Sequence, residues 1–440
     1  MSLNIRPATV AALALTLIAG ATLADEDKSA EEPRCSERNP EACDRDEIVE
    51  WVEWAVATSP EQVERRLSLD ALPGKPLFGG RRLDEWFAYK ARVEERYGLT
   101  WGTDYNAAWL RASESLGERT GFGGALRFFG VWEPGPADTR DAGALIWKIE
   151  HRHAYGSRVS PQALGSEVGY AGLLHLTLSD QRTRLSNLYW RQRWNDGNLV
   201  FVGGWTDTSD YVDVYTLASP WTSFFNYAFS TGSAAMPVPN EGLGLAVGGY
   251  IGDRIYAVAG FADANSDPHR PSEAFDTFFS EREYFKHVEF GFARSRENTW
   301  LNNTHLTLWQ VDERTEAGVP DGWGANLSWS RLFADFWTVF ARAGYAKDGG
   351  SILQKSLSVG GAISRVPAGN QLGIGVNWGE VNESTYGPGL DDQVTVEVYY
   401  RIHAWEELEL TPDVQFIRNP ALNPDTSSLW VIGLRARLAF

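Results

Sequence analysis

In the last segment of the chain, residues 430–440, every second side chain from Trp430 to Phe440 is apolar, and two arginines lie between them. Successive side chains on a β-strand point to opposite faces. Ile432 and Leu434 therefore share one face, while Arg435 and Arg437 occupy the other. A strand that is apolar outside, charged inside and ends on an aromatic residue, here Phe440, is typical of a transmembrane β-barrel. The pattern favours a membrane barrel although the average composition resembles that of a water-soluble protein.

The first 24 residues have the features of a secretory signal peptide. Arg6 precedes an apolar run over residues 8–23, and Thr22-Leu23-Ala24 is a small-residue cleavage site. After Ala24, no apolar stretch approaches the roughly 18 residues that a membrane-spanning helix requires. We therefore expect residues 1–24 to be removed on export, which leaves a soluble periplasmic protein or an outer-membrane barrel.

Residue usage favours the barrel. The chain contains 43 glycines and 19 tryptophans, and turn signals recur from residue 99 to residue 440. Trp and Tyr concentrate where lipid meets water, and membrane barrels carry them in two girdles. A large soluble all-β protein with a Trp-rich core is the alternative, but its strands would not end so regularly in aromatic residues. The net charge of −18 argues against a nucleic-acid partner, which would need a basic face.

Residues 25–98 differ from the rest and are predicted to form an N-terminal periplasmic segment. Cys35 and Cys43 are the only cysteines, and the oxidising periplasm would join them in a small disulfide loop. Residues 46–69 and 82–97 carry apolar side chains at helical spacing and are predicted to form two short helices. The segment could plug the barrel, bind a partner or serve as a poorly packed leader to the first strand. The leader is the favoured interpretation.

Residues 99–440 are predicted to form the outer-membrane β-barrel, an all-β antiparallel fold. Alternation identifies about seventeen candidate strands. Since bacterial single-chain barrels have even strand numbers, about sixteen strands is the best estimate and eighteen the alternative. Ile374, Val376, Val396 and Val398 are expected to face lipid, and Glu397 and Arg401 the lumen. A barrel of this width encloses water rather than its own side chains.

The predicted lumen wall is rich in paired charges. The arginines on inward positions are Arg127, Arg152, Arg191, Arg193, Arg342, Arg401, Arg435 and Arg437, and the carboxylates are Glu150, Glu289, Glu397, Glu407, Glu409 and Asp413. Sugar hydroxyl groups form hydrogen bonds with both guanidinium and carboxylate groups. We expect Arg127, Arg152, Arg191 and Arg193 to cluster at the narrowest level of the pore.

The aromatic partner of these arginines is expected from residues 206–240, the longest weakly patterned stretch. It contains Trp221, Phe224 and Phe225, whose rings could stack on the C–H face of a pyranose. A long loop of this kind would fold inward and narrow the pore. Alternatively, residues 221–229 form a further strand with interfacial aromatic side chains, and the sequence supports both interpretations equally.

Several short motifs follow one another in the C-terminal third. They are Glu397-Val398-Tyr399-Tyr400-Arg401, residues 410–417, Asn419-Pro420, Asn423-Pro424-Asp425 and Gly433-Leu434-Arg435. In this order they resemble the carbohydrate-selective porin (OprB) family, and residues 260–265 resemble a strand end of that family. The resemblance implies a 16-stranded outer-membrane barrel over residues 99–440, through which monosaccharides diffuse inward. Residues 140–240 match less clearly, so no sugar preference is implied.

Enzymatic functions are not favoured. The chain has no G-x-S-x-G elbow, no Walker A loop and no H-E-x-x-H motif. His151 and His153 are interpreted as interfacial histidines near a strand end, so neither a metal nor a cofactor is expected. A sugar-diffusing porin is favoured over a general or weakly ion-selective porin and over a structural or adhesive barrel. The expected partners are small sugars, outer-membrane lipid and the barrel-assembly machinery, which would recognise Phe440.

Overall fold

The computed structural model describes residues 62–71, 76–79, 83–135, 141–294, 299, 301–334, 336–364 and 369–440. The expected signal peptide, Cys35, Cys43 and most of the expected helix over residues 46–69 lie outside these ranges. The strands are β1 (Leu99–Ala112), β2 (Thr120–Trp132), β3 (Gly143–Ala154), β4 (Arg182–Trp194), β5 (Leu199–Thr206), β6 (Gly242–Ile251), β7 (Ile255–Asp263), β8 (Tyr284–Ala293), β9 (Asn303–Val311), β10 (Gly322–Phe333), β11 (Trp337–Asp348), β12 (Leu353–Ser364), β13 (Gln371–Val381), β14 (Gln393–His403), β15 (Leu408–Arg418) and β16 (Ser428–Ala439). The helices are α3 (Val63–Ala71), α4 (Asp84–Tyr97), α5 (Leu164–Glu167), α6 (Ala274–Asp276) and α7 (Glu383–Tyr386).

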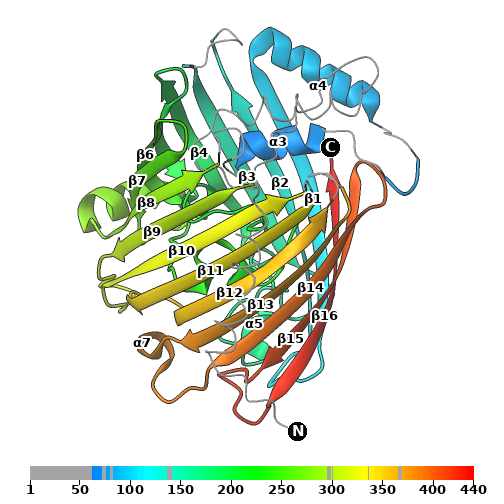
Figure 1. Cartoon of the computed structure of the whole chain (residues 1–440), viewed down its shortest axis with the longest axis vertical. Helices are drawn as coiled ribbons and strands as arrows, with labels where there is room; N and C mark the ends of the chain where they lie inside the picture. The colour runs from blue at the N-terminus through cyan, green and yellow to red at the C-terminus, as the bar shows by residue number, and fades with distance from the viewer. Residues whose placement is uncertain are drawn as a thin grey trace.

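The sixteen strands form one closed antiparallel barrel, in which β1 pairs with β16 (Figure 1). At this seam the N–H of Phe440 donates to the carbonyl of Thr103 at 2.9 Å, and the N–H of Thr103 donates back at 3.0 Å. Closure removes both sheet edges, so every strand has two hydrogen-bonded neighbours, as a barrel in lipid requires. The prediction of sixteen strands is confirmed, and the alternative of eighteen is wrong.

The two ends of the barrel differ in the length of their connections. At the end that carries α3, α4 and the C-terminus, strands are joined by tight turns such as residues 195–198 and 252–254 (Figure 1). The longest connections at the opposite end are residues 155–181, 207–241 and 264–283. Outer-membrane barrels turn their short connections to the periplasm and their long loops to the outside. The end with the C-terminus is therefore the periplasmic end.

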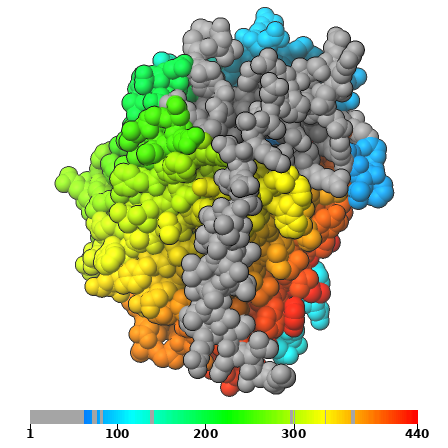
Figure 2. All heavy atoms as spheres, in the orientation of Figure 1, coloured from blue at the N-terminus to red at the C-terminus, as the bar shows by residue number. Residues whose placement is uncertain are grey.

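Outward-facing positions are apolar and exposed, as the alternation predicts. Ile374, Ile432 and Leu434 are among the exposed side chains, whereas Glu397, Arg435 and Arg437 are buried inside the barrel. Exposed tryptophans mark both rims: Trp132, Trp194 and Trp337 near the periplasmic end, and Trp323 and Trp430 near the extracellular end. Figure 2 shows atoms of the green, yellow and orange strands at the surface of this face of the molecule. Among the helices that the structure describes, none combines the length and apolarity needed to span a membrane.

The face assignment predicts a strong dependence of stability on depth. Val376 faces outward at the centre of β13, so Val376→Arg is expected to lower the free energy of unfolding by roughly 2–4 kcal/mol. Leu372 lies on the same face near the periplasmic end of this strand, where an arginine costs about 0–1 kcal/mol. Denaturant unfolding in lipid vesicles would measure both values. Equal losses at the two positions would contradict the assignment.

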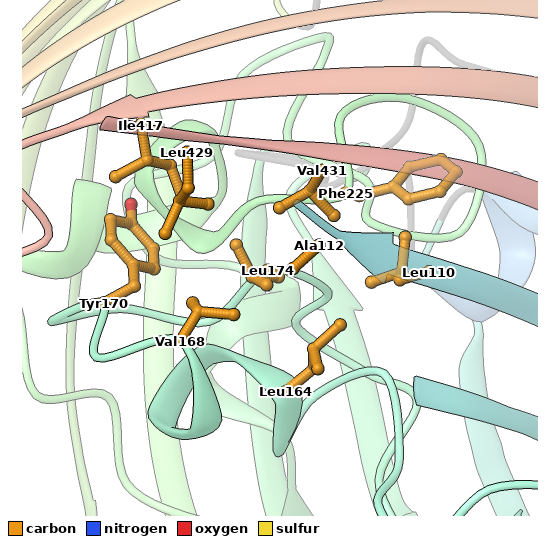
Figure 3. Packing of buried hydrophobic residues seen from close by; sticks show 10 residues of the cluster. All are labelled: Leu110, Ala112, Leu164, Val168, Tyr170, Leu174, Phe225, Ile417, Leu429 and Val431. Carbon is orange, nitrogen blue, oxygen red and sulfur yellow. The ribbon is translucent and has the colours of Figure 1, made fainter. Parts of the chain in front are cut away.

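Two long extracellular loops fold into the barrel. We call residues 155–181 the cap loop and residues 207–241 the inner loop. Figure 3 shows side chains of the cap loop and of the inner loop meeting inward-facing side chains of β1, β15 and β16. The cluster consists of Leu164, Val168, Tyr170 and Leu174 of the cap loop, Phe225 of the inner loop, and Leu110, Ala112, Ile417, Leu429 and Val431 of the wall. Both loops therefore form a buried layer inside the extracellular half.

The alternative of a strand over residues 221–229 is wrong. The backbone N–H of Asn226 donates to the carboxylate of Glu397 on β14 at 3.0 Å, and the N–H of Phe225 donates to the same carboxylate. The inner loop thus satisfies its backbone with side chains of the wall instead of a neighbouring strand. Its inward course agrees with the other prediction made for this stretch.

The helices before β1 take two different positions. α4 coincides with the helix expected over residues 82–97 and ends at Gly98, which adopts the left-handed conformation at φ 63°. α3 lies at the end of the other expected helix, and its Val63 and Leu67 are buried against wall residues of the barrel. The interpretation of a poorly packed leader is wrong for α3, because inward-facing apolar residues of β2 and β3 provide a surface that the helix covers.

Candidate functional site

Two arginines of the barrel wall contact one tryptophan of the inner loop. The guanidinium carbon of Arg127 on β2 lies 4.1 Å from the centroid of the Trp221 ring, and that of Arg152 on β3 lies 5.6 Å from it. A cation within about 6 Å of an indole face is attracted by the negative potential of the ring. Arg127, Arg152 and Trp221 are all buried, and we call them the Arg–Trp cluster.

Carboxylates hold both arginines in place. Arg127 makes a two-pronged pair with Asp104 on β1, at 2.8 Å from Nε to Oδ1 and 2.5 Å from Nη2 to Oδ2. Arg152 pairs with Glu150 on its own strand at 2.5 Å. The planar two-pronged pair fixes the orientation of the Arg127 guanidinium as well as its position, while Nε and Nη2 of Arg152 both contact Oε2 of Glu150. The two cations are therefore presented to the ring in a defined geometry.

One member of the cluster, Arg127, belongs to a row of alternating charges that crosses four strands. The register places Asp104 opposite Arg127, Arg127 opposite Glu150, and Glu150 opposite Arg184. Each cation in the row therefore faces an anion, which offsets the large cost of removing these groups from bulk water. The row offers donors and acceptors side by side at one level of the barrel.

Sequence reasoning missed two members of this row, Asp104 and Arg184. Arg184 is buried and pairs with Glu241 at the end of the inner loop. The register of β3 and β4 shifts between Lys148 and Ile149, and Ser186 and Asn187 in β4 are both buried. Counting alternate positions back from Arg191 therefore places Arg184 on the wrong face. No local pattern in the sequence marks this bulge.

Arg191 and Arg193 do not join the Arg–Trp cluster, and the expectation that all four arginines would cluster is wrong. Arg191 pairs with Glu64 of α3 and, at 2.5 Å, with Glu133, while Arg193 pairs with Glu133 at 2.7 Å. β4 runs from the extracellular to the periplasmic end, so Arg191 lies roughly 20 Å along the strand from Arg184. These two arginines therefore belong to the periplasmic mouth.

Two further predicted lumen arginines anchor the inner loop. Arg435 on β16 donates to the carbonyl of Pro220 at 2.8 Å and lies 4.4 Å from the centroid of the Phe225 ring. Arg401 on β14 donates to the carbonyl of Thr222 at 3.3 Å. Bonds on both sides of Trp221 thus fix the segment that carries it. Arg437 instead pairs with Asp104 at 2.8 Å and with Asp70 of α3 at 2.6 Å.

Phe224 and Phe225 are packing residues. Phe224 meets the rings of Phe229, Phe340 and Tyr399 at centroid distances of 4.7, 5.9 and 4.9 Å. Phe225 lies against His175 of the cap loop at 4.9 Å and under Arg435. Of the three aromatic residues predicted from this stretch, the structure brings Trp221 alone to Arg127 and Arg152.

Asp213 is a second anchor that sequence reasoning missed. It accepts hydrogen bonds from Arg342 at 2.6 Å, Asn326 at 2.9 Å and the N–H of Gly232 at 2.8 Å, and pairs with His305 at 3.0 Å. Burial raises its pKa, but Arg342 and the other donors outweigh burial and lower the pKa to about 2. Asp213 therefore ties the inner loop to the wall opposite the Arg–Trp cluster as an anion.

The predicted interfacial histidines lie on the outward side of β3. His151 contacts the hydroxyl of Thr183 at 2.8 Å and His153 that of Tyr105 at 3.0 Å. Within the ranges that the structure describes, no three His, Cys, Asp or Glu residues are grouped so as to hold a metal ion.

Comparison with known proteins gives a family and a fold. The model of the family described as carbohydrate-selective porin, OprB family, matches residues 81–317 and 322–440. The high-pH structure of Pseudomonas putida OprB aligns with a TM-score of 0.64 and 13% identity, over 81% of this chain and 97% of that one. Its low-pH structure aligns with a TM-score of 0.50 and 12% identity, over 82% of this chain and 98% of that one. No curated protein sequence matches the chain significantly.

Proposed function

Because the chain belongs to the OprB family of carbohydrate-selective porins, we propose that small sugars contact the Arg–Trp cluster as they cross the barrel. The chain is an outer-membrane porin that lets small carbohydrates diffuse into the periplasm. Its family and fold are those of a channel rather than of an enzyme. Our proposal concerns the residues that the sugar contacts.

The arrangement of Arg127 and Arg152 around one indole ring is the observation that carries this proposal. A pyranose has polar edges and an apolar C–H face, so it fits a site with guanidinium donors, carboxylate acceptors and an aromatic ring. A sugar that enters the row would take the place of the cation–π contacts that Trp221 makes with Arg127 and Arg152. The ion pairs with Asp104 and Glu150 would keep both arginines in place. Binding stays weak enough for release, as conduction requires.

Liposome swelling distinguishes the three candidate functions. With the purified protein in vesicles, we expect swelling to be faster in a neutral monosaccharide than in a neutral non-sugar solute of similar size. A general porin would rank the two solutes by size alone. A structural or adhesive barrel would admit neither. Equal rates for size-matched solutes would contradict the proposed site, and absence of swelling would contradict channel function.

We also propose that Phe440 is the signal read by the barrel-assembly machinery, and that lipid contacts the outward face that this residue completes. Phe440 closes the seam with Thr103 at the periplasmic end, where it is accessible before closure. Deleting Phe440 is expected to lower the amount of heat-modifiable folded barrel in the outer membrane severalfold, and Phe440→Tyr should retain it. Folded protein at the wild-type level after the deletion would refute the proposal.

A further inference from the structure

An apolar patch lines the inner wall at the periplasmic end of the barrel. It consists of Phe129 and Val131 on β2, Ala144 and Ile146 on β3, and Tyr189 on β4, all buried. A bare apolar patch of this kind would be unfavourable in water. The apolar wall residues at the extracellular end are likewise covered, by the cap loop and the inner loop. Helix α3 covers it with Val63 and Leu67, whose side chains are 1% and 9% exposed.

The fit between α3 and the wall is close. A side chain at Gly102 on β1 would place its Cβ 3.0 Å from a methyl carbon of Leu67 and 2.8 Å from the Phe129 ring. The glycine therefore leaves room for the helix to approach the strand. The helix packs against β1, β2 and β3 at the level of the periplasmic turns (Figure 1).

Ion pairs hold both ends of α3. Glu64 pairs with Arg191 on β4, and Asp70 pairs with Arg437 on β16 at 2.6 Å. Burial opposes the ionisation of both acids, but the facing arginines hold the pKa of Glu64 and of Asp70 below their usual values. β16 and β4 flank β1–β3 in the barrel, so the helix is tied on both sides of the patch.

The same charges connect α3 to the Arg–Trp cluster. Asp70 pairs with Arg437, Arg437 pairs with Asp104, and Asp104 holds Arg127 against Trp221. Arg437, Asp104, Arg127 and Trp221 are buried, and Asp70 is half-buried with 15% of its side chain exposed. A helix at the periplasmic mouth is therefore linked by direct ion pairs to the proposed sugar contact in the barrel.

We propose that α3 is a built-in part of the channel that narrows the periplasmic mouth and limits the flux of solute. The proposal rests on the channel function and adds a second restriction, at the opposite end from the cap loop and the inner loop. Glu64 and Asp70 are its positioning residues, and Val63 and Leu67 form its apolar contact with the wall.

Single-channel conductance in planar bilayers tests the role of α3. The double variant Val63→Asp/Leu67→Asp places two charges against the apolar patch and is expected to raise the open-channel ion conductance by roughly twofold or more. Ser68→Asp adds a charge to a half-buried neighbour outside the apolar cluster and should leave conductance unchanged. Heat modifiability would show that all the barrels are folded. A second variant, Glu64→Gln, keeps the apolar contact of Val63 and Leu67 but removes the ion pair with Arg191. It should raise the frequency of channel opening.

The outcomes separate this proposal from the sugar site. A conductance rise supports the α3 restriction even if sugar does not block the current, because ion flow requires no sugar contact. Folded Val63→Asp/Leu67→Asp channels with wild-type conductance, together with wild-type opening in Glu64→Gln, would overturn it. Should the double variant fail to fold, the opening frequency of Glu64→Gln alone decides the question.

A second observation concerns the outside of the barrel, where α4 carries an aromatic stripe. Trp86, Tyr89, Val93 and Tyr97 share one face of the helix at i, i+3 and i+4 spacing. The three aromatic side chains are 38%, 47% and 57% exposed. The ring centroids of Trp86 and Tyr89 lie 6.0 and 6.2 Å from that of Trp101, which faces outward on β1. The aromatic stripe therefore continues the lipid-facing surface of the barrel.

We infer that α4 lies in the headgroup layer of the periplasmic leaflet, with its aromatic stripe on lipid. Aromatic side chains favour this layer, and an amphipathic helix beside a membrane protein lies along it. Continuity with Trp101 places the stripe at the level of the periplasmic girdle. The exposed Asp84, Glu85 and Arg92 lie on the rest of the helix surface, which suits the aqueous side.

Spin labels test the position of α4. In a Cys35→Ser/Cys43→Ser background, we would label Tyr89→Cys on the stripe and Ala91→Cys on the opposite face, in proteoliposomes. Oxygen is expected to relax the label at position 89 more strongly than a water-soluble nickel chelate does, with the reverse at position 91. Equal, water-like accessibility at both positions would overturn the inference. Shielding of position 89 from both reagents would also overturn it, because a protein surface would then cover the stripe.

Discussion

Asp213→Ala is expected to lower the free energy of unfolding by about 3–5 kcal/mol, because it leaves buried Arg342 without its carboxylate partner. The pair is inside the barrel at 2.6 Å, and both side chains are almost fully shielded from solvent. The variant also removes the acceptor for Asn326 and for the N–H of Gly232. The inner loop should therefore loosen, which would appear as noisier open-channel current.

An exposed pair of similar length provides the control for Asp213. Asp312 contacts Lys286 at 2.7 Å, but its side chain is 29% exposed and that of Lys286 is 46% exposed. Asp312→Ala should cost less than about 1 kcal/mol, since water screens the pair. Denaturant unfolding in vesicles would measure both variants. Similar losses for the two would contradict the role of Asp213 as the anchor of the loop.

The effect of Asp213 also has a defined pH window. Its folded-state pKa of about 2 lies below the ordinary value, so its contribution to stability is complete at pH values above the ordinary pKa. The contribution is lost as the pH falls through about 2. The free energies of unfolding of the wild type and of Asp213→Ala should therefore differ most at neutral pH and become equal in strong acid.

Asp104→Ala is expected to impair both stability and sugar contact. Asp104 is fully buried and contacts two buried arginines, Arg127 at 2.5 Å and Arg437 at 2.8 Å. Removing one partner of a buried pair costs about 3–5 kcal/mol, and Arg437 retains Asp70. Arg127 should lose its orientation toward Trp221, so monosaccharide should block the ion current less strongly. Asp104→Asn should recover part of the stability, because its amide oxygen still accepts a hydrogen bond.

The two readouts for Asp104 contradict the account in different ways. If Asp104→Ala unfolds at the same denaturant concentration as the wild type, the buried pairs contribute little to stability. Unchanged sugar block in a folded Asp104→Ala channel would show that Arg127 does not need this carboxylate to take part in the site.

The strands could be predicted from the sequence because lipid imposes a local rule. Outward positions such as Ile374, Ile432 and Leu434 must be apolar, so each strand shows its two faces within its own residues. The same rule placed Arg127, Arg152, Arg435 and Arg437 on the inner wall. This rule predicts whether a side chain faces lipid or lumen. It predicts neither the depth of the residue in the membrane nor the residue that it contacts.

Depth and partners depend on contacts between distant segments. Arg191 and Arg184 lie on one strand, yet Arg191 meets α3 and Arg184 meets Glu241 of the inner loop. Asp213 belongs to no periodic pattern, because its partners come from β9, β10 and β11. The bulge between β3 and β4 and the docking of α3 likewise depend on segments far apart in sequence, which alternation does not detect.

We propose that Trp221, Arg127 and Arg152 form the contact for sugar, and titration of monosaccharide block in planar bilayers tests this most directly. Trp221→Leu should raise the half-blocking concentration about tenfold, which corresponds to about 1.4 kcal/mol. Phe224→Leu is the control, since Phe224 packs on Phe229 and Tyr399 rather than on an arginine. The account predicts weaker block for Trp221→Leu and unchanged block for Phe224→Leu. Wild-type block in folded Trp221→Leu channels would contradict it.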